Sequence, residues 1–207
     1  MDAQQRITFI RDRLHLVPVP GFPELRHWAP HPASGLSLLD YDEAPYWAYL
    51  WPGGAALLHH LTACPNTVAG RRVLDLGAGS GLAGIMALKQ GATSALASDP
   101  SDMAQSVAAM NAVSNEVTLK TTGATSSTNL PQIDLVLAGD IFYDADMAAL
   151  LLPLLRSLRD TGAEVLIGDI GRRHLPDGLR RIAHYPVRDV GDSPATAPLT
   201  AGVFSLP

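Results

Sequence analysis

Cysteine is almost missing from this chain, with Cys64 alone among 207 residues. One cysteine cannot form an internal disulfide, and neither paired cysteines nor paired histidines have the spacing of zinc ligands. A disulfide framework and a structural zinc site are therefore excluded, and we predict no bound metal. The same scarcity favours a reducing compartment, so we expect a cytoplasmic protein.

Charged residues and long apolar runs are also scarce. Only 17% of the residues are charged, and 20 acidic against 15 basic side chains give a net charge of −5. This balance argues against binding to nucleic acid or to an anionic membrane, both of which require a basic surface. The longest apolar run, Met147 to Leu155, contains Pro153 and is far shorter than the roughly 20 residues of a membrane-spanning helix. The sequence does not indicate an oligomeric state.

A chain of this length fits one domain with a sizeable hydrophobic core. We expect residues 1–207 to form that domain, with a Rossmann-like core over 67–207. Residues 1–66 would precede the core as an amphipathic helix over 4–16, a long irregular proline-rich arm over 17–45 and a second helix over 54–61.

The remainder of the chain alternates short apolar strands with helices, which is typical of an α/β protein with a doubly wound, mostly parallel sheet. The last two strands have no helix between them and are expected to form an antiparallel C-terminal hairpin. The expected strands cover 72–76, 94–98, 117–121, 133–138, 164–168, 182–190 and 199–206, and the expected helices cover 82–90, 103–113 and 147–159. This pattern predicts a seven-stranded sheet.

A glycine-rich loop containing Gly77, Gly79 and Gly81 follows the first of these strands and begins a helix. Such a loop lets the backbone approach a nucleotide-type ligand, although a strained turn without a ligand is the alternative. The dinucleotide fingerprint needs a further glycine where this chain has Leu82. Asp75 would repel a pyrophosphate but can hold an amino group. These two features favour S-adenosylmethionine over NAD.

Asp99 ends the second strand, where a carboxylate can accept hydrogen bonds from both hydroxyl groups of a ribose. NAD and S-adenosylmethionine share that ribose, so Asp99 does not distinguish between them. Its alternative role is that of a turn or helix-capping residue.

Three segments together resemble a known family. Val73 to Gly81 resembles motif I of the class I, seven-strand S-adenosylmethionine-dependent methyltransferases. Pro45 to Gly54, with its Trp-Pro-Gly-Gly sequence, and Gly139 to Asp144, with its Asp-x-x-Tyr signature, are similar to the electron transfer flavoprotein β-subunit lysine methyltransferases. The resemblance extends from about Ile10 to Pro207.

The resemblance implies methyl transfer from S-adenosylmethionine to the side-chain amine of a protein lysine, with the electron transfer flavoprotein β subunit as the favoured substrate. A ribosomal protein or a small-molecule amine is the alternative acceptor for the same fold. Asp140 would hold the target amine, and Tyr143 would shape the pocket around the lysine side chain. The alternative is that Asp140 caps the next helix and Tyr143 packs against the protein.

The resemblance also assigns cofactor contacts. Trp51 is expected to touch the cofactor, Gly139 to lie beneath it, and Ala124 or Thr125 to lie near the adenine. Packing is the favoured role for Tyr46 and Trp47, while Asp169 would either line the substrate channel or stabilise a turn.

Several carboxylates are expected near the catalytic side, where they would attract a basic, lysine-bearing segment: Asp40, Asp42, Glu43, Asp140, Asp144, Asp146 and Asp169. A nicotinamide-dependent oxidoreductase or a non-enzymatic binding module remains a competing hypothesis. The lack of a Tyr-x-x-x-Lys pair argues against the oxidoreductase.

Overall fold

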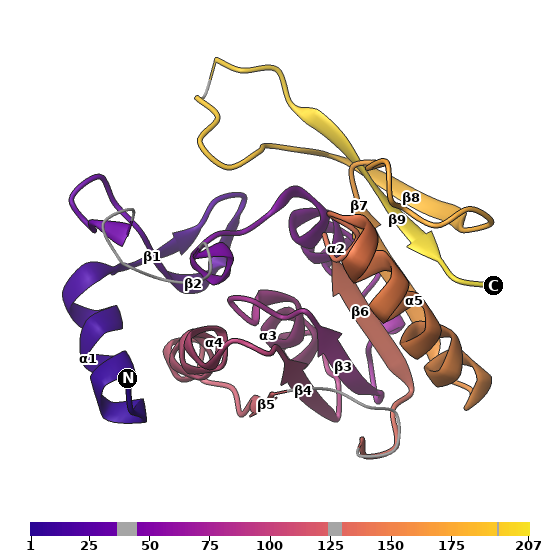
Figure 1. Cartoon of the computed structure of the whole chain (residues 1–207), viewed down its shortest axis with the longest axis horizontal. Helices are drawn as coiled ribbons and strands as arrows, with labels where there is room; N and C mark the ends of the chain where they lie inside the picture. Colours follow the sequence, from indigo (N-terminus) through magenta and orange to yellow (C-terminus); the bar gives the residue numbers. More distant parts are fainter. Residues whose placement is uncertain (37–44, 124–129, 194) are drawn as a thin grey trace.

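The computed structural model describes residues 1–36, 45–123, 130–193 and 195–207 (Figure 1). Its centre is a seven-stranded sheet in the order β5-β4-β3-β6-β7-β9-β8. The strands are β3 (Arg72–Leu76), β4 (Ser94–Ser98), β5 (Lys120–Thr122), β6 (Leu135–Gly139), β7 (Glu164–Asp169), β8 (Arg180–Val187) and β9 (Leu199–Ser205). The predicted seven-stranded sheet is confirmed.

The sheet is mixed, with parallel strands in one part and antiparallel strands at its C-terminal end. The first five strands of the sheet, from β3 to β7, pair in parallel. β9 pairs antiparallel with both β7 and β8, which confirms the predicted C-terminal hairpin. Parallel strands place their carboxyl ends at one edge of the sheet, which is where ligands bind in doubly wound folds.

The largest errors in the predicted strand boundaries are three residues each. The strand expected from residue 117 begins at Lys120, because the amide of Val117 donates to the carbonyl of Ala112 and still belongs to the end of the preceding helix. The strand expected to reach residue 190 ends at Val187, because the amides of Asp189 and Val190 bond to aspartate side chains within the turn.

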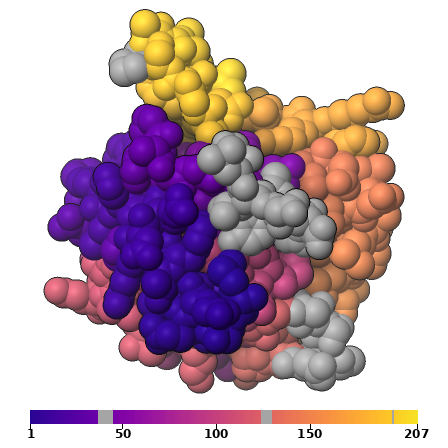
Figure 2. Space-filling view, turned by 60° about the vertical axis from the view of Figure 1, so that its left-hand side comes forward, coloured from indigo at the N-terminus to yellow at the C-terminus, as the bar shows by residue number. Residues whose placement is uncertain are grey.

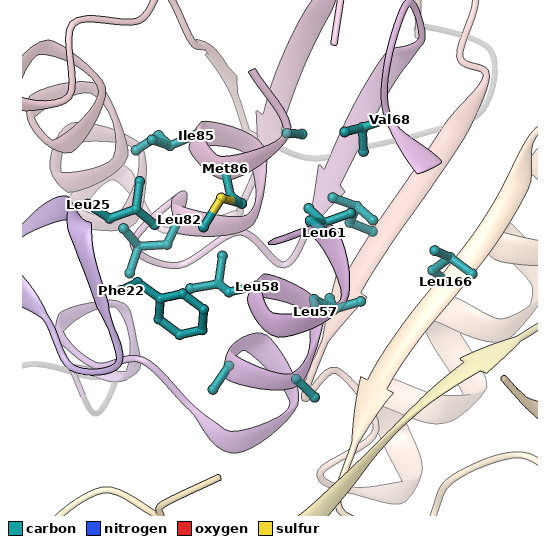
Figure 3. Packing of buried hydrophobic residues seen from close by; sticks show 14 of the residues in the cluster. Phe22, Leu25, Leu57, Leu58, Leu61, Val68, Leu82, Ile85, Met86 and Leu166 are labelled. Carbon is teal, nitrogen blue, oxygen red and sulfur yellow. The ribbon is translucent and has the colours of Figure 1, made fainter. Parts of the chain in front are cut away.

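Helices cover both faces of the sheet. One face packs against α2 (Pro52–Ala63), which lies on β6 and β7, and against α3 (Leu82–Lys89), which lies on β3 and β4. Figure 3 shows the apolar side chains of α2 and α3 in this cluster, among them Leu57, Leu61 and Leu82. The other face packs against α5 (Ala145–Asp160) through Leu151, Leu155 and Leu158. α4 (Asp102–Ser114) adds a third cluster with the N-terminal segment. No helix in the described part of the chain is long and apolar enough to cross a bilayer.

The helix expected over 4–16 ends at Arg13, and the irregular arm expected over 17–45 was wrong over 17–29. Residues 37–44 of that arm lie outside the described residues. After α1 (Ala3–Arg13), the chain forms an antiparallel hairpin from β1 (His15–Val19) and β2 (Phe22–Ala29). Gly21, with φ +83°, supplies the left-handed residue that the turn requires. Proline is tolerated in a two-stranded ribbon because each strand has an edge that needs no ladder hydrogen bond.

Asn111 in α4 and Asn115, which caps the C-terminal end of that helix, attach this hairpin to the core. The side chain of Asn115 accepts the amide of Arg26 at 2.9 Å and donates to the carbonyl of Arg26 at 2.6 Å. Asn111 accepts the amide of Trp28 at 2.8 Å and donates to the carbonyl of Ser80 at 2.8 Å. The N-terminal segment therefore lies against the body of the molecule, while the C-terminal hairpin projects from it (Figure 2).

Candidate active site

The glycine loop leaves β3 in a conformation that other residues rarely adopt. Gly77, Gly79 and Gly81 all have positive φ, at 66°, 49° and 74°. A Cβ on Gly81 would also lie 2.7 Å from the Cβ of Ala108, so this glycine allows α3 to pack against α4. The loop sequence is thus required by backbone geometry as well as by any ligand.

Asp99 fastens this loop to the end of β4. Its Oδ2 accepts the amide of Gly79 at 2.9 Å, and its Oδ1 accepts the amide of Ser101 at 2.9 Å. The turn role that the sequence left open is therefore part of the structure. A half-buried carboxylate beside the loop also remains suited to a ribose.

Asp75 is the buried carboxyl group of the site. Its side chain is 2% exposed, and its Oδ2 accepts the amide of Gly84 at 2.8 Å. Burial raises the pKa of Asp75 to about 7, with a further increase from the charge of Asp99, although the Gly84 hydrogen bond opposes the shift. Among the described residues, no cationic side chain forms an ion pair with Asp75.

The first turn of α2 touches the strand ends backbone to backbone. A Cβ on Gly53 would lie 2.1 Å from the carbonyl oxygen of Gly168, and one on Gly139 would lie 2.9 Å from the backbone of Gly54. The Trp-Pro-Gly-Gly segment thus begins α2, with proline in the first turn of the helix. Its glycines lie where the helix touches the backbone at the strand ends. This approach closes one side of the site.

Asp140 follows β6 with φ 59°, a left-handed conformation that is uncommon for an aspartate. Its Oδ2 accepts the amide of Gly54 at 2.8 Å, and its Oδ1 forms an ion pair with Arg172. Burial raises the pKa of Asp140, while the charge and hydrogen bond of Arg172 oppose that increase. Its side chain is 9% exposed.

Aromatic rings gather beside this part of the site. Tyr46 and Tyr143 are 58% and 52% exposed, and their ring centroids lie 6.2 Å apart. The Tyr46 ring also lies 5.7 Å from that of Trp51, whose Nε1 donates to the Tyr46 carbonyl at 2.9 Å. Packing was the favoured role for Tyr46 and Trp47, and it is confirmed for the buried Trp47 and wrong for Tyr46.

These groups surround a small hollow with a cavity volume of about 60 Å³ that opens to solvent. That volume is below the about 300–1,000 Å³ typical of small-molecule sites, so a large ligand bound here would remain partly exposed. The described residues lining it include six predicted site residues: Trp51, Asp75, Gly77, Gly79, Gly139 and Asp140. Segments distant in sequence therefore meet at the carboxyl ends of β3 and β6.

Comparison with known proteins identifies the family. A family model for lysine methyltransferases matches residues 32–176. The chain belongs to the lysine methyltransferase family. It is 39% identical over 153 residues to the electron transfer flavoprotein beta subunit lysine methyltransferase of Danio rerio, covering 70% of this chain and 59% of that protein. The Homo sapiens protein of the same name is 41% identical over 131 residues, covering 62% and 50%.

This family member spans about half to three fifths of the length of those curated relatives. Its fold is shared with a solved ribosomal protein L11 methylase from Lactobacillus delbrueckii subsp. bulgaricus. That structure has a TM-score of 0.51 and 23% identity, and the match covers 72% of this chain and 76% of that chain. The predicted family and fold class are both confirmed.

The remaining predicted residues of this lysine methyltransferase family member lie beside the hollow or outside the described residues. Gly81 and Asp99 shape the glycine loop, and the ring of Tyr143 lies beside that of Tyr46, which lines the hollow. Ala124 and Thr125 lie outside the described residues, as do Asp40, Asp42 and Glu43. Their predicted contacts stay predictions.

The carboxylates that were expected to attract a basic substrate differ in their exposure. Asp144 and Asp146 are exposed at the start of α5, where Asp144 also caps the helix by accepting the amide of Met147. Asp169 is fully buried, and its Oδ1 accepts the amides of Gly171 and Arg172 at 2.7 Å each. Of its two expected roles, the turn is the one that these bonds support.

Sequence reasoning gave no role to several residues that build this site. Arg172 received no role, and its pairing with Asp140 joins residues 32 positions apart. Asn111 likewise reaches the glycine loop across 31 positions. Polar side chains on a helix give no sequence signal for such contacts. Tyr46, which lines the hollow, was assigned mainly to packing.

Proposed function

We propose that this chain transfers a methyl group from S-adenosylmethionine to the side-chain amine of a protein lysine. The observation that carries the proposal is the hollow beside the glycine loop, which places Asp75 at one part of its wall and Asp140 at another. Membership of the lysine methyltransferase family supports the same activity.

The residues of the hollow fit the cofactor. Asp75 is a buried carboxyl without a cationic side-chain partner among the described residues, and an amino group placed against it would stabilise the charged form. Gly77, Gly79 and Gly139 keep the adjoining surface free of side chains, and Trp51 offers a ring face. Asp99 is held against the glycine loop next to the hollow, where it suits the ribose. When bound, S-adenosylmethionine supplies a methyl group activated by a sulfonium. The adenine contact that we propose for Ala124 completes this set.

At the other side of the hollow, Asp140 would accept a hydrogen bond from the neutral target amine and orient its lone pair. Tyr143, with Tyr46 beside it, would border the lysine side chain as it enters. Because displacement at a sulfonium needs little covalent assistance, alignment and exclusion of water are the main contributions of these groups.

The electron transfer flavoprotein β subunit is the proposed substrate, because both cited relatives carry that name at about 40% identity. The net charge of −5 favours a protein rather than a nucleic acid as the acceptor. Cytoplasmic localisation is part of this proposal and is supported by the lone cysteine.

The direct test combines purified protein, methyl-labelled S-adenosylmethionine and the electron transfer flavoprotein from the same source, with mass-spectrometric mapping of labelled residues. We expect label on a lysine of the β subunit, and a loss of about a hundredfold in rate for Asp140→Asn with S-adenosylhomocysteine binding retained. Asp144→Asn, at an exposed cap nearby, is the matched control. Label found only on small molecules would overturn the substrate, and unchanged activity of Asp140→Asn would overturn the role of Asp140.

A thermal-shift comparison tests the cofactor separately. S-adenosylhomocysteine should raise the melting temperature of the protein, since a ligand that binds only the native state stabilises it. NAD should not. Stabilisation by NAD alone would favour the competing oxidoreductase hypothesis.

A further inference from the structure

Arg172 occupies an unusual position between two buried carboxylates. Its Nη1 contacts Oδ1 of Asp140 and lies 3.2 Å from Oδ2 of Asp169. The exposed fractions of the three side chains are 21% for Arg172, 9% for Asp140 and 0% for Asp169. One guanidinium therefore serves two acids that have little access to water.

The rest of the environment cannot replace this cation. Asp140 receives one backbone amide, from Gly54 in α2, and Asp169 receives the amides of Gly171 and Arg172. In the described part of the chain, no other cationic side chain forms an ion pair with either acid. Two like charges in a desolvated site disfavour each other, so one of them would take up a proton if the guanidinium were removed.

Arg172 contacts Asp140 without lining the hollow itself. Asp140 is among the residues lining the hollow, whereas Arg172 is not among the described residues that line it. Its influence on a ligand must therefore pass through Asp140. We propose that Arg172 is a positioning residue that keeps Asp140 ionised and aimed into the hollow, so that Asp140 accepts a hydrogen bond from the methyl-acceptor amine.

This inference rests on the proposed function, and the chemistry of an amine explains why the charge matters. An ionised carboxylate can only accept hydrogen bonds, so it binds an N–H of the amine and leaves the nitrogen lone pair free to attack the methyl group. A protonated carboxyl can donate its O–H to that lone pair and block the attack. The reaction therefore requires the ionised form of Asp140.

The groups facing Asp140 determine the direction of the effect. Burial raises the pKa of Asp140, and the nearby charge of Asp169 raises it further. The charge and hydrogen bond of Arg172 lower it, as does the amide of Gly54. Loss of Arg172 removes the only cation in this set, so the carboxyl of Asp140 should then titrate at a higher pH.

The first experiment measures this titration without any substrate. Protein labelled with ¹³C at aspartate carboxyl groups is titrated by NMR, with the Asp140 signal assigned from Asp140→Asn. We expect the midpoint to rise by more than one pH unit in Arg172→Gln and to stay unchanged in Arg173→Gln, the adjacent exposed arginine. Asp169→Asn should move the midpoint down, since it removes the repelling charge. A midpoint that moves in neither Arg172→Gln nor Asp169→Asn would overturn the proposal.

The second experiment links the titration to the reaction. In Arg172→Gln, the acidic limb of the profile of kcat against pH should move upward, and kcat at pH 7 should fall at least tenfold. S-adenosylhomocysteine affinity should change less than twofold, and Arg172→Lys should restore part of kcat. A parallel loss of S-adenosylhomocysteine affinity and melting temperature, with an unshifted pH profile, would assign Arg172 a structural role only and overturn the proposal.

Failure of the proposed function gives a different result. If the wild-type protein methylates no lysine, the NMR titration still measures the dependence of Asp140 on Arg172. If the wild-type protein does methylate lysine but the Asp140 midpoint is the same in Arg172→Gln and in the wild type, the role proposed for Arg172 is refuted and the proposed function stands.

Discussion

Asp75 combines full burial with a carboxyl group that must be charged to hold an amino group. In the folded, ligand-free protein its pKa is about 7, against 3.8 for an exposed aspartate. Because the folded pKa lies above the unfolded one, the folded state is favoured at low pH. Stability is lost as the pH rises from about 4 to about 7.

Asp75→Asn should remove this loss. At about 1.4 kcal/mol per pKa unit, the shift from 3.8 to about 7 corresponds to about 4 kcal/mol. The free energy of unfolding of ligand-free Asp75→Asn should therefore fall less between pH 4 and pH 8 than that of the wild type. Urea denaturation at both pH values measures the difference. Equal pH dependence in the two proteins would contradict the assigned pKa.

His27 on β2 has the opposite pH dependence. It is 5% exposed, its Nδ1 has no hydrogen-bond partner among the residues that the structure describes, and burial lowers its pKa to about 4. A folded pKa below the unfolded value of 6.5 means that stability is retained above pH 6.5 and lost as the pH falls toward 4. His27→Phe should reduce the loss of unfolding free energy between pH 7 and pH 4 by about 3 kcal/mol. His184→Phe, at an exposed position, is the control that should leave the pH dependence unchanged.

Among single residues, the sequence predicted those whose place in the site follows from their position at the end of a strand. Asp75, Gly77 and Asp140 were predicted from their places at strand ends, and all three line the hollow. Arg172 received no role, because its pairing with Asp140 depends on a loop folding back across the sheet edge.

Among the helices and strands, too, some were predicted from the sequence and one pair was missed. The parallel strands were predicted because burial on both faces requires continuous apolar runs, as in Val136, Leu137 and Ala138. The β1–β2 hairpin was missed because its prolines disfavour regular structure in sequence. Pairing of its two strands, together with Asn111 and Asn115, supplies the stabilisation that propensity does not show.

The contact of α2 with the strand ends gives a prediction at the scale of an element. Gly53→Ala would place a Cβ 2.1 Å from the carbonyl oxygen of Gly168, so we expect a loss of about 3 kcal/mol or more in unfolding free energy. Gly54→Ala is the matched control, because its Cβ would meet only Leu50 at 3.4 Å. Alanine is favoured in helices by about 1 kcal/mol, so the control should unfold within about 1 kcal/mol of the wild type. Equal losses in the two variants would contradict the close approach.

Asn111 connects parts of the molecule that are far apart in sequence. It is fully buried, accepts the amide of Trp28 in the N-terminal hairpin and donates to Ser80 in the glycine loop. Asn111→Ala should leave both backbone groups without this partner, at a cost of about 1–3 kcal/mol each.

Hydrogen exchange measures this connection directly. In Asn111→Ala the amide of Trp28 should exchange faster, and S-adenosylhomocysteine should bind more weakly because the glycine loop loses a support. Asn66→Ala, at an exposed position, should change neither. Faster exchange without weaker binding would limit Asn111 to anchoring the hairpin.

The structure changes the interpretation of the net charge of the whole molecule. A net charge of −5 suggested an acidic face near the site, but Asp75, Asp140 and Asp169 are buried. Their charges act on ligands inside the hollow and on Arg172, while Asp144 and Asp146 remain at the surface.

The sequence by itself determined the layered α/β fold, the glycine loop and the carboxylates at the strand ends, because apolar periodicity and backbone requirements are local properties. Only the tertiary structure decided how those groups are paired. Three contacts depend on distances across the edge of the sheet. They are the ion pair of Arg172 with Asp140, the hydrogen bond from the Gly79 amide to Asp99, and the backbone contact of Gly53 with Gly168. The state of each carboxylate follows from that packing, since burial and neighbouring charges set its pKa.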